Sequence, residues 1–327
     1  MAVVELPKRH LCVVSNSEIK TFRLCMRKWK YAYKMLRRPI QTAYALRFGT
    51  LIHHALEAWW RSGGDLAAAL NAITLHESDP FERAKARAMI RGYHVRWSAE
   101  ELTVIAVEVM FECDLVNPAT GRNSRNYRRT GKIDAICQKP DGTYWLVEHK
   151  SSGEDIGVGS SYWKKLKIDG QISMYVEGAK LTFGYEIAGC LYDVLRKPAQ
   201  KPYQVGKARP QAETPDEYEE RILTGAGGKK DDSSIMGDPD RYLRRGNVVR
   251  MADEMEEANY DVWQAVQNMH AAATSDRYPR NVDACNSFHR DCEYLPVCAG
   301  EASIEDDTLY RTARAAHEEL VDDSKCE

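Results

Sequence analysis

A carboxylate and a lysine one residue apart, Glu148 and Lys150, have the types and spacing that catalysis could use. Side chains alternate between the two faces of a β-strand, so this pair projects from one face. Asp134 lies on the preceding predicted strand of the same hairpin, where cross-strand pairing brings a second carboxylate beside Glu148. Two adjacent carboxylates are costly without a cation, and such hard oxygen ligands suit Mg²⁺, which keeps coordination positions open for a phosphate.

Phosphodiester hydrolysis is the chemistry that uses such a site. A bound Mg²⁺ polarises the phosphate and lowers the pKa of a bound water, and Lys150 would orient that water or balance the charge that develops on the phosphorus oxygens. The alternative is a structural salt bridge among Asp134, Glu148 and Lys150, which the short D…E-x-K pattern alone does not exclude.

Residues before and after this pattern extend it into an ordered set. The set includes a G-T-x-x-H sequence upstream and, downstream, a glutamine and a tyrosine four residues apart, which makes them neighbours on one helical face. It resembles the nuclease motifs of the PD-(D/E)XK superfamily, specifically of its RecB-like and Cas4-like branch. In chain order its members are Gly49, Thr50, His53, Gly131, Asp134, Glu148, Lys150, Gln171 and Tyr175.

The resemblance implies a role for six of these residues. The implied metal ligands are His53, Asp134 and Glu148. Lys150 takes the role of the catalytic lysine, and Gln171 and Tyr175 contact DNA or support the active site. Adjacent His54 is the rival ligand to His53, and position within the motif favours His53.

The activity implied is Mg²⁺- or Mn²⁺-dependent hydrolysis of DNA, with exonuclease action on ends or single strands, in recombination, repair or phage DNA processing. No ATP-binding G-x-x-x-x-G-K-[ST] sequence is present, so unwinding must come from a partner such as a helicase, a recombinase or a single-strand-annealing protein. Two rival classes are a non-catalytic DNA-binding or assembly subunit that keeps the fold and an electron-transfer protein. The complete set of active-site residues favours the enzyme, because a binding module has no use for paired carboxylates.

Three cysteines crowd into one short segment, at Cys285, Cys292 and Cys298, and Cys25 lies far away near the N-terminus. Because the chain shows no export signal, metal or cluster ligation explains them better than disulfides do. The four positions resemble the split four-cysteine arrangement of Cas4-like and AddB-like nucleases. This implies a [4Fe-4S] cluster that clasps the N-terminal helix to the C-terminal segment.

A Zn²⁺ site is the alternative to the iron-sulfur cluster. Six residues separate Cys285 from Cys292, where relatives often have only two, and His289 falls in that gap. Three cysteines and one histidine are a common structural zinc set. Cys25 distinguishes the two sites, because a zinc site that uses His289 has no need of it.

The composition is that of an ordinary soluble globular protein, with 43% hydrophobic and 29% charged residues. The first ten residues lack the apolar core of a signal peptide, and nowhere do about 18 uncharged apolar residues run together. We therefore expect a cytoplasmic protein without membrane association.

Charge is distributed unevenly along the chain. The net charge is −2, but residues 301–327 hold nine acids against three bases, so the remainder is positive. Residues 20–47 carry nine Lys or Arg and no acid, interleaved with aromatic residues such as Trp29, and a second basic stretch covers 122–132. Such mixtures suit phosphates and base faces, with a solvated helix face and a flexible loop as the alternative.

Periodicity predicts the elements that must position these residues. Helices are predicted over 15–36, 49–61, 80–100, 169–180 and 242–273, and strands over 104–113, 129–138, 143–150 and 186–195. The turn at 139–142 joins two of the strands into an antiparallel hairpin. This order predicts an α/β, restriction-endonuclease-like core in which helices flank a small mixed β-sheet.

The predicted organisation is one nuclease domain followed by a tail. The domain covers 1–300, with a helical part over 15–100, a sheet core over 101–196, and a helical part with the cysteine segment over 197–300. Residues 301–327 form the predicted acidic tail.

Overall fold

A six-stranded mixed β-sheet forms the centre of the computed structural model, which describes residues 11–41, 43–206, 210–228, 233–287 and 290–320. Five strands follow the order β1-β4-β5-β6-β7, and β3 pairs with β4. The pairs β1/β4 and β5/β6 are parallel, and the others are antiparallel. The strands are β1 (Cys12–Val14), β3 (Thr103–Val116), β4 (Asn123–Gln138), β5 (Tyr144–Ser152), β6 (Ile187–Arg196) and β7 (Leu243–Val248).

Strand β4 pairs with three other strands, and these pairings leave part of one of its edges without a partner strand in the described chain. β3 runs along one edge of β4. On the other edge, β1 pairs with residues 127–129 and β5 pairs with residues 135–138. Within the described chain, no strand pairs with that edge over residues 130–134. We call this gap, bounded by β1 and β5, the β4 fork.

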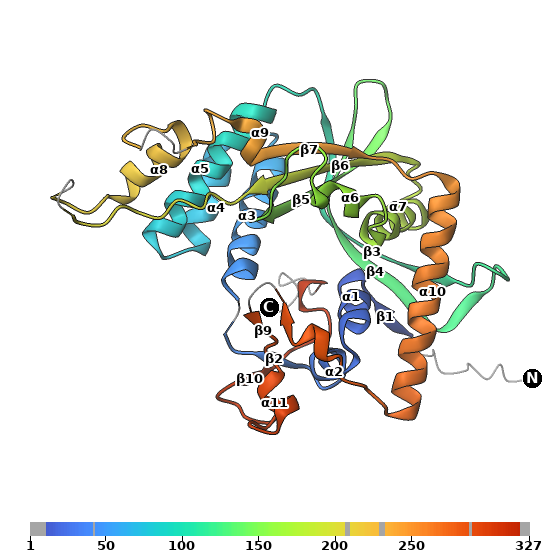
Figure 1. The fold of residues 1–327 in the computed structure, drawn as a ribbon. Helices are drawn as coiled ribbons and strands as arrows, with labels where there is room; N and C mark the ends of the chain where they lie inside the picture. Colours follow the sequence, from blue (N-terminus) through green and yellow to red (C-terminus); the bar gives the residue numbers. More distant parts are fainter. Residues whose placement is uncertain (1–10, 42, 207–209, 229–232, 288–289, 321–327) are drawn as a thin grey trace, which may run out of the picture.

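Helices cover both faces of the sheet (Figure 1). On one face, α3, α4, α5 and α8 bury a core with Ala135 and Val147, and on the other, α1, α7 and α10 bury a core with Ile136 and Leu146. Neighbouring residues of a strand thus point into opposite cores, as strand geometry requires. The mixed α/β architecture with a helix-flanked mixed sheet is confirmed, and it is consistent with a restriction-endonuclease-like core. The helices are α1 (Asn16–Leu24), α2 (Met26–Trp29), α3 (Tyr44–Arg61), α4 (Leu66–His76), α5 (Pro80–Trp97), α6 (Ser161–Leu166), α7 (Gly170–Phe183), α8 (Pro215–Thr224), α9 (Pro239–Tyr242), α10 (Ala252–Ser275) and α11 (Leu295–Ala299), with shorter turns η1 (Lys30–Lys34), η2 (Val282–Ala284) and η3 (Glu318–Leu320).

The helix predicted over 15–36 is interrupted. At Cys25 the backbone is extended, with φ −161° and ψ 117°, so α1 ends there and α2 begins directly after it. The π-helical turn η1 follows. Phe22 and Trp29, on either side of the break, are buried in the same core. The apolar spacing therefore continues across a break that periodicity cannot reveal.

Two sheet strands lie in segments for which periodicity predicts helix or nothing. The helix predicted over 242–273 begins only at α10, because residues 243–248 pair with β6 as β7. β1 has three residues, which is too short to show alternation. Helix α4 was also not predicted.

The C-terminal part of the described chain packs against the N-terminal helices. β10 (Tyr310–Thr312) pairs antiparallel with β2 (Arg37–Pro39), and the buried Arg37 side chain donates to the Ile304 and Tyr310 carbonyls. Figure 1 shows α2, β2, β10 and α11 gathered at one end of the molecule, near the small β8 (Asn286–Ser287) and β9 (Arg290–Asp291) hairpin. Residues 321–327 of the predicted acidic tail lie outside the described residues.

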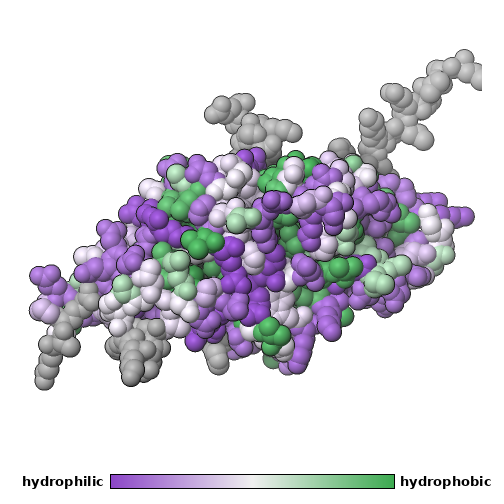
Figure 2. Space-filling model, turned by 90° about the horizontal axis from the view of Figure 1, so that it is seen from above, coloured by the Kyte–Doolittle hydropathy of each residue, from purple (hydrophilic) through white to green (hydrophobic). Residues whose placement is uncertain are grey.

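The face of the molecule drawn in Figure 2 is mostly hydrophilic, and its hydrophobic residues form small separate patches. In the described part of the chain, no helix is both long enough and apolar enough to cross a membrane.

Candidate active site

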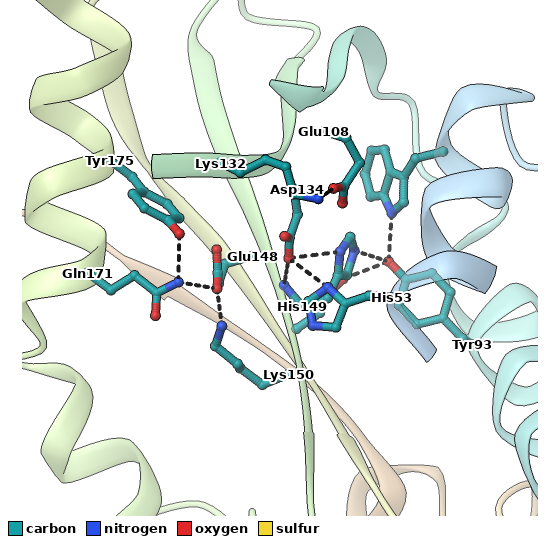
Figure 3. A network of polar contacts seen from close by, with 12 residues as sticks. His53, Tyr93, Glu108, Lys132, Asp134, Glu148, His149, Lys150, Gln171 and Tyr175 are labelled. Carbon is teal, nitrogen blue, oxygen red and sulfur yellow. Dashed lines mark hydrogen bonds and ion pairs between the residues drawn. The ribbon is translucent and has the colours of Figure 1, made fainter. Parts of the chain in front are cut away.

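One pocket of about 480 Å³ opens at the β4 fork, and all six predicted catalytic residues line it. They are His53 from α3, Asp134 from β4, Glu148 and Lys150 from β5, and Gln171 and Tyr175 from α7. The rival histidine, His54, also lines the pocket, but its ring stacks on His76 at 4.1 Å. His53 Nδ1 instead lies 3.6 Å from Asp134 Oδ2 (Figure 3).

Three carboxylates occupy neighbouring positions on three adjacent strands. The pairing of Ala135 with Val147 sets Glu148 beside Asp134 across β4 and β5, as the hairpin predicts. The β3/β4 register sets Glu108 beside Asp134 on the other side. Asp134 is 9% exposed and Glu148 2% exposed, and buried charges so close together require compensating groups.

Asp134 is held at the point where the hairpin parts. The backbone N–H of His149 donates to Asp134 Oδ2 at 2.7 Å and so finds an acceptor where the strand ladder has ended. His53 Nδ1 and His149 Nδ1 lie 3.6 and 3.5 Å from the same oxygen. Burial alone would raise the pKa of Asp134, but these histidines outweigh it and hold the pKa well below its usual range.

Glu148 is held through one oxygen and leaves the other open. Lys150 Nζ forms an ion pair with Oε1, and Gln171 Nε2 donates to the same oxygen at 2.7 Å and to the Tyr175 hydroxyl at 3.1 Å. Oε2 is buried and has no hydrogen-bond partner among the described residues. Burial and the charge of Asp134 raise the pKa of Glu148, a conflict that a cation beside both carboxylates would relieve.

Lys150 keeps its proton in this setting. Burial opposes the charge of its ammonium group, but Glu148 and Asp134 outweigh this effect and raise the pKa of Lys150. The site therefore presents a fixed cation beside the open Glu148 oxygen.

Glu108 is a site residue that the sequence reasoning missed. It forms an ion pair with Lys132, and its carboxylate, the Asp134 carboxylate and the His53 ring have ligand atoms within 4.8 Å of one another. Burial raises the pKa of Glu108, and Asp134 adds to the effect. One signal was available, because Glu108 is the only charged residue in the apolar run 104–111 of a predicted strand.

A buried polar network behind the pocket also escaped the sequence reasoning. The His149 ring, 3% exposed, lies between Asp134 and Asp193, with Nε2 3.9 Å from Asp193 Oδ2. Tyr93 donates its hydroxyl proton to Asp193 at 2.7 Å, and Arg245 donates to both oxygens of the same carboxylate. This network fixes the ring that stands behind Asp134.

Part of the basic stretch over 20–47 makes ion pairs within the protein. Several of its cations pair with acids elsewhere in the chain: Lys20 with Asp169 at 3.0 Å, Lys28 with Glu293 at 3.0 Å, and Arg37 with Asp307 at 2.9 Å. Trp29 is fully buried and so is not placed to stack on bases. These residues hold distant segments of the protein together.

The four predicted cluster cysteines lie in two segments that pack against each other. The Arg27 backbone N–H donates to the Pro279 carbonyl at 3.2 Å, and Asn281 Nδ2 donates to the Leu24 carbonyl at 2.9 Å, on either side of Cys25. All four thiols are half-buried. Burial raises the pKa of Cys298, and the nearby thiols of Cys25 and Cys285 contribute to the shift. Cys292 provides the fourth thiol of the predicted cluster set.

The spacing of these thiols differs from that of a formed zinc site. Zn–S bonds of about 2.3 Å in a tetrahedron place ligand atoms about 3.8 Å apart. Among the described His, Cys, Asp and Glu residues, the only group of three ligand atoms within 4.8 Å of one another consists of His53, Glu108 and Asp134. No three of the described cysteine thiols lie that close together. His289, the predicted fourth zinc ligand, lies outside the described residues.

Sequence comparison with known families agrees with this geometry. The family model for the PD-(D/E)XK nuclease superfamily matches residues 13–299, which include every residue placed in the pocket except Leu320.

The chain belongs to the PD-(D/E)XK nuclease superfamily.

Solved structures similar to this PD-(D/E)XK nuclease include a Eubacterium rectale protein named as a candidate exonuclease, with 11% identity, coverage of 88% of each chain and a TM-score of 0.47. Another is the protein named SSO0001, with 14% identity, coverage of 69% of this chain and 77% of that one, and a TM-score of 0.27. No curated protein matches the chain.

Proposed function

We propose that this nuclease is a Mg²⁺- or Mn²⁺-dependent deoxyribonuclease of the RecB-like and Cas4-like branch, acting as an exonuclease on DNA ends or single strands. One observation carries the proposal. The buried Glu148 leaves Oε2 without a partner in the pocket that it shares with ionised Asp134 and protonated Lys150. This combination suits a divalent cation and a phosphate, because it supplies ligands for the first and a counter-charge for the second.

The residues present fit a divalent metal. His53, Asp134 and Glu148 would hold it, and Glu108 adds a fourth donor on the far side of Asp134. When bound, the ion would supply Lewis-acid activation of the scissile phosphate and of a water molecule. The open Glu148 oxygen and the cross-strand carboxylates support this assignment.

The chain's own residues orient the reacting groups. Lys150 holds a proton on Nζ beside the pocket, from which it can donate to an attacking water or to a phosphate oxygen. Gln171 and Lys150 fix the Glu148 carboxylate through Oε1, so that Oε2 keeps one direction. The His149 N–H does the same for Asp134. Such preorganisation lowers the reorganisation needed at the moment of reaction.

Lys150→Ala tests the proposal. Labelled linear DNA, 5′-labelled or 3′-labelled, and circular DNA are incubated with wild-type or variant protein and with Mg²⁺, Mn²⁺ or EDTA. We expect wild type to degrade the linear DNA and spare the circle, EDTA to stop the reaction, and Lys150→Ala to slow it by roughly 10²–10³-fold. Lys180→Ala is the matched control, because that exposed lysine pairs with Glu186 at the end of α7. Equal rates for wild type and Lys150→Ala would remove the mechanism.

We further propose that Cys25, Cys285, Cys292 and Cys298 hold a [4Fe-4S] cluster. The packing of 279–281 against the break in α1 at Cys25 supports this assignment, and so does the mutual influence of the thiols. Its role would be structural, as a clasp between the N-terminal helices and the C-terminal segment. Zn²⁺ bound by three cysteines and His289 is the alternative.

A further inference from the structure

Helix α1 begins inside the active-site pocket. Ser15, Asn16 and Ser17, which form its N-terminus, line the same pocket as Glu148 and Lys150. Ser15 Oγ accepts from the Glu18 N–H at 3.2 Å, so the cap satisfies one of the free backbone donors. The N–H groups of Asn16 and Ser17 have no acceptor within the described parts of the chain.

The Asn16 side chain is a second, separate group at this helix end that could bind a ligand. Asn16 is only 8% exposed, yet its amide makes no hydrogen bond to any described residue. Its Oδ1 lies next to the start of α7, 3.8 Å from the point where a Cβ on Gly170 would stand. The following residue, Gln171, holds Glu148. The residue as a whole is nearly buried, but its amide atoms keep solvent access at the pocket that Asn16 lines, so they are available to a ligand there.

Charge at this helix end favours an anion. The nine-residue helix contributes partial positive charge at its N-terminus. The only acid of its first turn, Glu18, turns away, because its carboxylate accepts from Trp29 Nε1 at 2.8 Å and pairs with His317 at 3.1 Å. No carboxylate of α1 therefore competes for the free donors.

We propose that the Asn16 amide, together with the backbone N–H groups of Asn16 and Ser17, binds a DNA phosphate next to the one that is cut. This inference rests on the proposed nuclease function and adds a subsite to it. The ligand is a phosphate group, supplied either by an internal diester of the strand or by a terminal monoester. By holding the neighbouring phosphate, the subsite sets which bond faces Glu148 and Lys150.

Asn16→Asp separates phosphate binding from helix stability. An acid at the first position of a helix favours the helix but repels a phosphate. We therefore expect an unfolding temperature at or above that of wild type and roughly tenfold weaker DNA binding, because charge-assisted hydrogen bonds are replaced by repulsion. Asn71→Asp is the control, because Asn71 is an exposed helical asparagine on α4. It should bind DNA as wild type does.

Binding is measured by fluorescence anisotropy with Ca²⁺ in place of Mg²⁺, so that the readout does not depend on cutting. The labelled oligonucleotides carry a 5′-phosphate, a 3′-phosphate or hydroxyl ends. A penalty that is equal for all three identifies an internal diester, and a penalty confined to one end identifies a monoester. In the Mg²⁺ reaction, Asn16→Ala should raise KM and leave kcat unchanged, as loss of uniform binding predicts.

Two results would overturn the subsite. One is wild-type affinity for DNA in both Asn16→Asp and Asn16→Ala. The other is a fall in kcat with unchanged KM in Asn16→Ala, which would mark a structural role. If Asn16→Asp unfolds early, Asn16→Ala decides through the same binding assay. Wild type that binds DNA in Ca²⁺ but never cuts it would contradict the proposed function alone, so the two failures are distinguishable.

Discussion

Glu108 occupies a backbone conformation that residues other than glycine rarely adopt, with φ of 54° inside β3. Such conformations persist only where surrounding structure enforces them, and they cluster at functional sites. In this protein the conformation accompanies a carboxylate that faces His53 and Asp134 and pairs with Lys132. Lys132 supplies a positive charge beside this carboxylate.

Glu108→Gln should therefore weaken Mn²⁺ binding by roughly 10–100-fold, on the scale measured when groups that support metal sites are removed. Calorimetric titration with Mn²⁺, or the cutting rate as a function of Mn²⁺ concentration, measures the change. Glu112→Gln is the control, because Glu112 lies on the same strand and its exposed carboxylate pairs with Arg128. Unchanged affinity in Glu108→Gln would exclude Glu108 from the metal site.

Gly131 shows why the motif has a glycine before its aspartate. A Cβ at this position would stand 2.7 Å from Phe111 Cε1 and 2.9 Å from Tyr175 Cε1. Gly131→Ala should cost about 1–3 kcal/mol of unfolding free energy, as overpacked cores do, and shift the tyrosine that contacts Gln171. Urea unfolding measures the loss. Gly153→Ala is the control, because a Cβ there meets nothing within 4 Å, and an equal loss in both would contradict the packing argument.

At this scale, the sequence predicts residues whose neighbours lie close along the chain. Glu148 and Lys150 share a strand face, and Asp134 reaches them through a short hairpin, so alternation and one turn suffice. Glu108 meets Asp134 only through the register of β3, and Asn16 enters the pocket only because α1 packs beside α7. Neither contact leaves a local pattern in the sequence.

At the scale of elements, the β4/β5 hairpin and α7 follow the predictions, because their periodicity is regular and their turn residues are distinctive. The break between α1 and α2 does not follow them. At the break, the backbone of Cys25 is extended and lies next to the segment 278–281. A continuous helix would give Cys25 a helical backbone and a different side-chain direction. The break is thus the local structure that the proposed cluster would need.

Cys25→Ser tests the cluster at this element. We expect wild type purified without oxygen to contain iron and acid-labile sulfide and to show a broad visible absorption band, and we expect Cys25→Ser to lose both. Cys12→Ser is the control, since Cys12 is exposed on β1. Zinc in place of iron, unaffected by Cys25→Ser, would exclude the cluster and favour the site with His289.

At the scale of the whole molecule, long-range ion pairs connect the basic stretch over 20–47 to distant parts of the chain. Lys28 pairs with Glu293, and Arg37 pairs with Asp307, although more than 260 residues separate the partners. A high local density of Lys and Arg occurs both in stretches that contact DNA and in stretches that pair with acids of the same protein. The sequence of residues 20–47 alone therefore does not distinguish these two roles. Only the cysteine resemblance indicated that the two ends of the chain would meet.

The proposed metal should stabilise the whole fold, because its proposed ligands come from strands and a helix that separate on unfolding. Mn²⁺ at about a hundredfold excess over its dissociation constant should add about 2.7 kcal/mol to the unfolding free energy. Thermal unfolding with Mn²⁺ or EDTA measures this gain. Glu148→Gln should reduce it, whereas Glu112→Gln should keep it. A gain of the same size in Glu148→Gln would place the ion elsewhere.

The β4 fork gives the smallest strand of the sheet an influence beyond its size. If β5 continued along β4 in its present register, its residues 153–155 would meet positions 127–129, which β1 already occupies. β1 thus prevents β5 from pairing with the whole length of β4, which would cover the pocket that contains Asp134 and Glu148. The three residues of β1 therefore keep the β4 fork open. In a protein without β1, we expect β5 to pair further along β4 and the entrance of the pocket to narrow.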